Sequence, residues 1–266
     1  MKFLMIGAHP DDTDLRCGGL AIQLVRHGHQ VRFLSLTTGN AGHQSMSRDE
    51  LRQRRQIEMT EAGKVYGVRY DTLGIDDGYL TADIPTREKL LRYIRHYAPD
   101  VIFTHRTCDY HPDHRAAGQL VNDCSYMVCV PLVCPDAPAP RDPPVILAYE
   151  DGFTVPAPFR ADIAVCCDDV INRKIEGVLK HVSQFYEWLA YNNHWDAVLN
   201  AQTDEEKKAY LTEGLKMRFS GPVKRYPEKF AAGAQYGEVF QIDEYGGKMT
   251  DEIMSAITGH SAKQAQ

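Results

Sequence analysis

The sequence predicts an α/β fold in which a mostly parallel sheet is flanked by helices. Two observations support this class. Apolar segments of strand length alternate with longer amphipathic segments through the first half of the chain, and turn residues separate them. This order builds strand–helix–strand units, whose right-handed crossovers make the connected strands parallel. With 266 residues and no internal repeat, the chain is long enough for one domain with a large core.

The strands are predicted from short apolar runs that end at polar residues. Residues 1–8 form the first strand, which stops abruptly at His9. The later strands are predicted at residues 30–36, 68–73, 100–104, 145–150 and 161–166, while residues 238–242 fit either a short last strand or a loop.

The clearest helix spans residues 47–66. Ser47 can cap its first turn, Glu50 stands three residues later as a capping box requires, and Gly67 ends it. The other helices are predicted at residues 15–27, 86–97, 112–128, 169–188 and 203–219.

The division of the chain follows from these elements. Residues 131–144 hold six prolines and are expected to form an irregular surface loop rather than a linker between domains. We therefore expect residues 1–266 to form a single domain. Its core covers about residues 1–190, and residues 191–266 add a helical and irregular extension.

Composition excludes several classes of partner. The net charge of −6 and the lack of a Lys/Arg block argue against nucleic acid. No apolar run approaches the ~20 residues that cross a bilayer, and the first residues lack the pattern of a signal peptide. The seven cysteines are odd in number and contain no C-x-x-C pair, which indicates free thiols in a reducing compartment. We expect a cytoplasmic protein.

Two clusters of ligand-type side chains follow two of the predicted strands. The first is His9-Pro10-Asp11-Asp12, and the second is Asp109-Tyr110-His111-Pro112-Asp113-His114. Open parallel sheets bind their ligands at the carboxyl ends of the strands, so the matched sets suggest one shared site. Imidazole and carboxylate donors favour a divalent metal that activates water, with zinc preferred.

The clusters offer more donors than one ion requires, so their roles must differ. Asp11 and Asp12 are adjacent and point in different directions, so one can bind the metal while the other accepts a proton from water. His111 and His114 lie three residues apart at a helix start and can share the site without sharing a role. Asp109 fits either a residue that supports a ligand or a helix cap.

Other cofactors are not expected. No G-x-G-x-x-G motif follows the first strand, which argues against nicotinamide binding. The glycines Gly39 and Gly42 fit a tight turn better than a phosphate cradle.

The two clusters resemble the two signatures of the PIG-L (LmbE-like) zinc-dependent N-deacetylases. The segment Thr38-Gly39-Asn40-Ala41-Gly42 resembles the family's Thr-Gly-Glu-x-Gly loop, with Asn40 in place of Glu. Arg55-x-x-Glu58 and Leu73-Gly74-x-x-Asp77-Gly78 follow in the family's order. Lys174 to Gln184 resembles its C-terminal elements, so the resemblance spans most of the chain up to about Gln184.

The resemblance implies a Rossmann-like fold that binds zinc in place of a dinucleotide. It implies one Zn²⁺ per chain, for which Fe²⁺ is an alternative because a His₂Asp set suits both. The roles that it implies are metal ligands at His9, Asp12 and His114, a general base at Asp11, an acid or oxyanion donor at His111, an orienting carboxylate for His111 at Asp113, and substrate contacts at Arg55 and Asp77.

Some positions keep two interpretations. Arg55 also fits an arginine on the surface of its helix, among Arg52 and Arg54, and Asp77 also fits a turn residue before Gly78. His181 and Gln184 share a helical face and either reach the site or only stabilise packing. Aromatic residues Trp188, Tyr191 and Trp195 fit a core, an interface or a surface that stacks on sugars. The loss of charge at Asn40 predicts a different substrate or a reorganised loop.

The expected function is a zinc hydrolase that removes an N-acyl group, with acetyl favoured, from an amino-sugar-containing small molecule. The partner is then a small-molecule amide, and the resemblance implies a homo-oligomer. Three alternatives stay open: deacylation of a non-sugar amide, a metal-dependent phosphoesterase, which often uses two metals, and a non-catalytic binding protein on the same fold.

Overall fold

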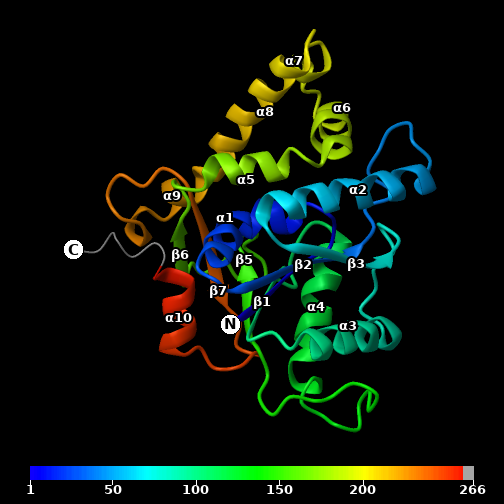
Figure 1. The fold of residues 1–266 in the computed structure, drawn as a ribbon, viewed down its shortest axis with the longest axis vertical. Helices are drawn as coiled ribbons and strands as arrows, with labels where there is room; N and C mark the ends of the chain where they lie inside the picture. Colours follow the sequence, from blue (N-terminus) through cyan, green and yellow to red (C-terminus); the bar gives the residue numbers. More distant parts are fainter. Residues whose placement is uncertain (260–266) are drawn as a thin grey trace.

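The computed structural model describes residues 1–259, and all seven of its strands form one sheet (Figure 1). Their order is β3-β2-β1-β4-β5-β7-β6, which confirms the predicted α/β class. The first five strands are parallel, whereas β7 runs antiparallel between β5 and β6. The strands are β1 (Lys2–Gly7), β2 (Gln30–Thr37), β3 (Arg69–Ile75), β4 (Val101–Thr104), β5 (Val145–Tyr149), β6 (Ile163–Cys166) and β7 (Gly237–Ile242).

The central strand β1 lies between β2 and β4. Met5 is aligned with Phe33 of β2 and with Phe103 of β4, and all three side chains are buried. The chain leaves β1 through α1 (Asp12–Arg26) towards β2, and leaves β4 through α4 (Pro112–Met127) towards β5. These two helices lie on opposite faces of the sheet. Such a reversal opens a crevice at the carboxyl ends of β1 and β4, where open sheets bind ligands.

Two apolar layers cover the sheet. On one face α1, α2 (Arg48–Tyr66) and α10 (Asp251–Thr258) pack around buried residues such as Leu20, Tyr66 and Ile257. On the other face α3 (Ile84–Tyr97) and α4 contribute Leu90 and Leu120 among others. Both faces of a parallel sheet must be covered because its strands are apolar throughout.

The ends of α2 follow the local signals in its sequence. The Ser47 side chain accepts from the Glu50 N–H while the Glu50 side chain accepts from the Ser47 N–H, which is the predicted capping box. Gly67 closes the helix with a φ of 77°, a left-handed conformation that glycine adopts without steric cost.

The predicted helix over residues 169–188 was wrong in its middle. Instead α5 (Ile171–Val178) ends, and a π-helix η1 (Ser183–Trp188) follows after a short break. At this break the His181 ring contacts Asp14, with Nε2 and Oδ1 3.0 Å apart, and both side chains are fully buried. The Ser183 N–H and hydroxyl both donate to Glu58 of α2, at 2.8 and 2.6 Å. These long-range bonds override the local helical pattern.

The chain beyond residue 190 is more than an outer extension. Strand β7, predicted as a strand or a loop, inserts between β5 and β6 and so belongs to the central sheet. The helices α6, α7 and α8 instead project beyond α5, away from the sheet (Figure 1). The remaining elements are α6 (Leu189–Asn192), α7 (Asp196–Leu199), α8 (Asp204–Phe219), α9 (Gly221–Arg225) and a 3₁₀-helix η2 (Pro227–Lys229). Residues 260–266 of the predicted extension lie outside the described residues.

Several other expectations are met. The proline-rich residues 131–144 contain no helix or strand and are anchored by Arg95, which donates to the carbonyls of Val133, Cys134 and Ala137. All seven cysteines are free. In residues 1–259 no helix combines the length and apolar character that a bilayer crossing demands.

A buried ion pair joins α5 to β7. Lys174 Nζ lies 2.8 Å from Glu238 Oε1, and both side chains are almost fully buried. The same carboxylate accepts from the N–H groups of Gly19 and Leu20 in α1, at 2.7 and 2.9 Å. Glu238 thus ties three elements together, and every charge in this cluster has a partner.

Substituting Lys174 by Met should destabilise the protein by about 3–5 kcal/mol, because it leaves the Glu238 charge buried without its cation. Urea unfolding measures this loss. The control is Lys180→Met, which removes a half-exposed lysine just beyond the same helix and should change stability by less than about 0.5 kcal/mol. Equal effects of the two substitutions would contradict the assigned role of the pair.

Candidate metal centre

The loop after β1 holds an unusual backbone conformation at Asp11. Its φ is 120°, a value that residues with a Cβ rarely adopt. The Asp11 N–H donates to the hydroxyl of Tyr70 at 2.9 Å, and this hydroxyl also accepts from Thr13 at 3.1 Å. Strained backbone of this kind persists where the surrounding structure holds it, often at functional sites. The Asp11 carboxylate lies near Arg55, whereas the Asp12 carboxylate lies near three histidines.

Three donor groups from the two predicted clusters meet beside this loop. His9 Nδ1 lies 3.2 Å from His114 Nε2 and 3.6 Å from Asp12 Oδ2, and His114 Nε2 lies 3.5 Å from Asp12 Oδ1. Zinc bonds of 2.0–2.2 Å in tetrahedral geometry place ligand atoms about 3.3–3.6 Å apart. The spacing of these nitrogens and the carboxylate therefore fits a metal of this size.

Two carboxylates hold the far side of the His9 ring. Its Nε2 lies 3.2 Å from Asp113 Oδ2 and 3.2 Å from Asp77 Oδ1. Asp113 Oδ2 also accepts from the Gly78 N–H at 2.7 Å, which fixes the carboxylate in place. Carboxylates at the second ring nitrogen orient a histidine and make it a stronger ligand. The structure thus places the Asp113 side chain against His9, and not against His111 as the sequence led us to expect.

Asp109 makes the same kind of contact to His114. Its Oδ1 lies 3.1 Å from His114 Nδ1 and also accepts from the His111 N–H at 2.9 Å. Of the two interpretations left open for Asp109, support of a ligand is the one with a direct contact. The cap of α4 is instead His111, whose Nδ1 accepts from the Asp113 N–H at 3.2 Å.

His105 belongs to the site, although sequence reasoning missed it. It follows β4 directly, is buried, and its Nε2 lies 3.2 Å from Asp12 Oδ2. Its ring stacks on that of His114, with the ring centroids 4.2 Å apart. Burial lowers the pKa of His105 to about 4, so the ring is neutral. The only available signal was its place at the end of a strand that leads into the second cluster.

Asp11 and Arg55 form a buried pair. The Arg55 side chain is 2% exposed, which excludes the interpretation of a surface arginine. Its guanidinium donates to the Pro10 carbonyl and lies 3.7 Å from Asp11 Oδ1. Burial raises the pKa of the Asp11 carboxyl to about 6, while the charge of Arg55 opposes this rise. Asp11 is therefore ionised at neutral pH and close to the pKa at which a general base works best.

The His111 ring is set up as a hydrogen-bond donor to the cavity. Because Nδ1 accepts from a backbone N–H, the proton of the neutral ring lies on Nε2. Burial and the neighbouring rings of His9 and His114 lower the pKa of His111. The cap and the lowered pKa both favour the neutral ring, so stabilising an oxyanion suits His111 better than acting as a charged acid.

Asn40 joins the two loops beside the site. Its amide donates to Asp76 Oδ1 at 3.1 Å, and its carbonyl accepts from the Asp77 N–H at 2.9 Å. An amide makes both contacts at once, whereas an ionised Glu can only accept. Asn40, which stands where the family loop has Glu, therefore forms hydrogen bonds to the loop after β3 that an ionised Glu could not all make.

A cavity of about 620 Å³ opens over these groups. Its walls include the proposed ligands His9, Asp12 and His114. Gln184 and Trp188 of η1 also line it, whereas His181 is fully buried against Asp14 behind it. The aromatic residues of this region have different places. Trp188 lines the cavity and stacks on Tyr191, whereas Trp195 packs among the helices that surround α8.

Comparisons with known proteins identify the relatives of this chain. Residues 4–125, which include both clusters, match the PIG-L family model, described as GlcNAc-PI de-N-acetylase. The diacetylchitobiose deacetylase of Thermococcus kodakarensis is 31% identical over 193 residues, which are 70% of this chain and 71% of that protein. The 4-oxalmesaconate hydratase of Pseudomonas putida is 22% identical over 229 residues, 81% of this chain and 88% of that protein.

A solved structure shows the same fold. The N,N'-diacetylchitobiose deacetylase from Pyrococcus horikoshii, complexed with an inhibitor, superposes with a TM-score of 0.72 at 24% identity, covering 92% of this chain and 84% of that one. The family model matches the segment that holds both clusters, and a relative that is 31% identical covers 70% of this chain. This chain therefore belongs to the PIG-L family.

Proposed function

We propose that this protein is a metal-dependent hydrolase that removes an N-acetyl group from an amino-sugar-containing small molecule. The proposal rests on one observation: His9, Asp12 and His114 lie within 3.6 Å of one another in one cavity. The carboxylate of Asp11, the proposed general base, lines the same cavity. Relatives named as deacetylases of diacetylchitobiose support the reaction and the substrate class. Trp188 in the cavity wall offers a face on which a sugar ring can stack.

The ion in this proposal is one Zn²⁺ per chain, which His9 Nδ1, the Asp12 carboxylate and His114 Nε2 would hold. When bound, it supplies Lewis-acid activation of a water and of the amide carbonyl. Each candidate donor group in residues 1–259 contains His9 or His114, which are two of the three ligands proposed here. Two imidazoles and a carboxylate also suit Fe²⁺, so the experiment below identifies which metal is bound.

The residues around the ion divide the remaining work. Asp11 takes a proton from the attacking water, the water oxygen bonds to the carbonyl carbon, and His111 Nε2–H donates to the carbonyl oxygen as negative charge develops there. The C–N bond then breaks, and Asp11 returns the proton to the leaving amine. The products are a carboxylic acid and a free amine. Arg55 keeps Asp11 ionised and in place, and His105 orients Asp12.

The function is tested by metal analysis together with amine release. The wild-type protein should contain one zinc or iron per chain by mass spectrometry and release amine from N-acetylglucosamine or its conjugates. Asp12→Asn should lose both metal and activity, because it removes a ligand. Metal without amine release from any N-acetyl sugar would contradict the deacetylase. In that case turnover of an unsaturated acid would favour a hydratase, because one relative of this chain is named a hydratase.

Asp11→Asn is the matched counterpart of Asp12→Asn at the adjacent position. We expect it to keep the metal and to lower kcat by about 10²–10⁴-fold, because the amide cannot accept the proton from water. Mass spectrometry and amine release on the same preparation measure both quantities. Equal metal loss in the two variants would overturn the division of roles between the carboxylates.

Asp109→Asn should weaken metal binding by about 10–100-fold, because His114 loses the carboxylate that orients it. Competition with a chelator measures the affinity. The control is Asp123→Asn in α4, whose carboxylate accepts from the Gln119 side chain, and it should leave the affinity unchanged. An unaltered affinity in Asp109→Asn would show that the contact to His114 has no such role.

A further inference from the structure

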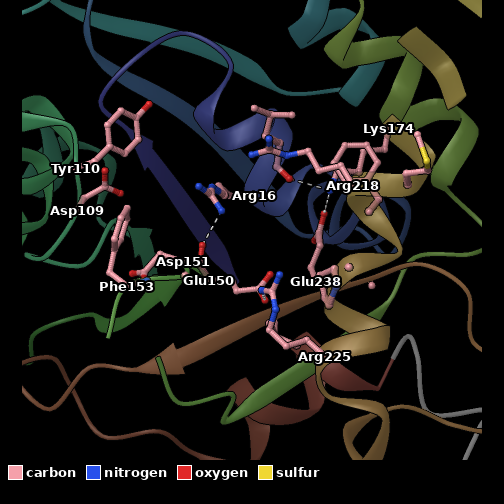
Figure 2. A pocket seen from close by; sticks show the side chains of 18 residues that line it. Arg16, Asp109, Tyr110, Glu150, Asp151, Phe153, Lys174, Arg218, Arg225 and Glu238 are labelled. Atoms are coloured by element: carbon pink, nitrogen blue, oxygen red, sulfur yellow. Dashed lines mark hydrogen bonds and ion pairs between the residues drawn. The ribbon is translucent and has the colours of Figure 1, made fainter. Parts of the chain in front are cut away.

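A second cavity of about 450 Å³ adjoins the one that holds the metal donors. Four residues line both cavities: Leu15, Arg16, Tyr110 and Arg218. The second cavity continues between α8 and the loop after β5, where Glu150 and Phe153 lie (Figure 2). A molecule bound at the metal donors can therefore extend past Arg16 and Arg218 into this space.

The charged groups of the second cavity are paired, with two exceptions. Arg225 binds the Glu150 carboxylate, and Lys174 binds Glu238 at 2.8 Å. Asp151 lies 3.0 Å from Arg106. Each of these pairs is neutral, and Asp109, which also lines the cavity, contacts the His114 ring.

Arg16 and Arg218 are the exceptions. Arg16 donates to the backbone carbonyl of Glu150 at 2.6 Å, which satisfies one N–H without neutralising its charge (Figure 2). The Arg218 side chain makes no hydrogen bond or ion pair within residues 1–259. Burial and the charge of Arg16 lower the pKa of Arg218 to about 10, so it stays charged at neutral pH. Two positive charges thus face the passage between the cavities.

From this charge pattern we infer that the substrate carries an anionic group, a phosphate or a carboxylate, which Arg16 and Arg218 bind while the N-acyl group lies at the metal donors. The inference rests on the proposed function and narrows its substrate class to acidic N-acyl amino sugars. The planar guanidinium fork matches the geometry of both anions.

Within residues 1–259 neither Arg16 nor Arg218 forms an ion pair with a carboxylate, although the charges of Asp11 and Asp12 favour the charged form of Arg218. The two guanidinium groups therefore keep free hydrogen-bond donors at the passage, which suits an anionic ligand.

The test compares acidic and neutral substrates that share one sugar. N-acetylglucosamine 6-phosphate and N-acetylmuramic acid represent the phosphate and the carboxylate, and N-acetylglucosamine is the neutral parent. In the wild type kcat/KM should be higher for at least one acidic substrate, and which one it is identifies the anion. Arg218→Gln should lower the ratio of acidic to neutral kcat/KM by roughly tenfold or more, chiefly through KM.

Two further variants sharpen the result. Arg218→Lys should recover part of the ratio, because it keeps the charge without the fork. Arg26→Gln removes a surface arginine of α1, paired with Asp169 at 2.5 Å, and should leave the ratio as in the wild type. An equal loss for acidic and neutral substrates in Arg218→Gln, or a wild type that favours the neutral sugar, overturns the inference.

A binding measurement separates this inference from the proposed function. Calorimetry with N-acetylglucosamine 6-phosphate and with its neutral parent needs no turnover. Tighter binding of the phosphate, lost in Arg218→Gln, supports the anion subsite even if no amide is hydrolysed and the deacetylase proposal fails. Equal binding of both sugars overturns the subsite whatever the reaction.

Discussion

Strands β1 and β4 are neighbours in the sheet, but the chain leaves their carboxyl ends towards opposite faces. The crevice between the two departing loops is where the metal donors meet. His9 and His114 are 105 residues apart in sequence, yet their ring nitrogens lie 3.2 Å apart. The pairing of Met5 with Phe103 sets the register that brings the two loops together. A slip of one residue would turn the side chains at each strand end to the other face.

The donors are in turn held by charges that surround them. Asp113 and Asp77 contact the far nitrogen of His9, and Asp109 contacts that of His114. Asp109 and Asp113 come from the segment where β4 leads into α4, whereas Asp77 comes from the loop after β3, so this loop also matters to a site built on β1 and β4. Asn40 extends the network by joining the loop after β2 to the same Asp77 backbone.

The base-type carboxylate is linked to the break between α5 and η1. Arg55 lies beside Asp11 and also 3.8 Å from Glu58, and Glu58 accepts both hydrogen bonds of Ser183. The interruption of the long helical pattern therefore brings η1, with Gln184 and Trp188, to the cavity wall. At the other end of the cavity Arg218 of α8 faces the passage to the second cavity, so the C-terminal helices shape the space for a substrate.

What the sequence by itself determined were the features that rest on local chemistry. The capping box and Gly67 delimit α2 through contacts within a few residues, and strands β1 to β5 follow from apolar runs between turns. Both ligand clusters were recognisable because each lies at a strand end, with its donors close together in sequence. The resemblance to a known family then implied the division of roles among them.

Only the tertiary structure decided which groups act on one another across the chain. The helical pattern over 169–188 was overridden by Asp14 and Glu58, which lie more than a hundred residues earlier. Partners from other loops likewise explain why Arg55 is buried, why His105 belongs to the site and why Asp113 contacts His9. Periodicity and spacing describe neighbours within a helix or a strand, whereas these side chains are placed by the packing of separate elements around one crevice.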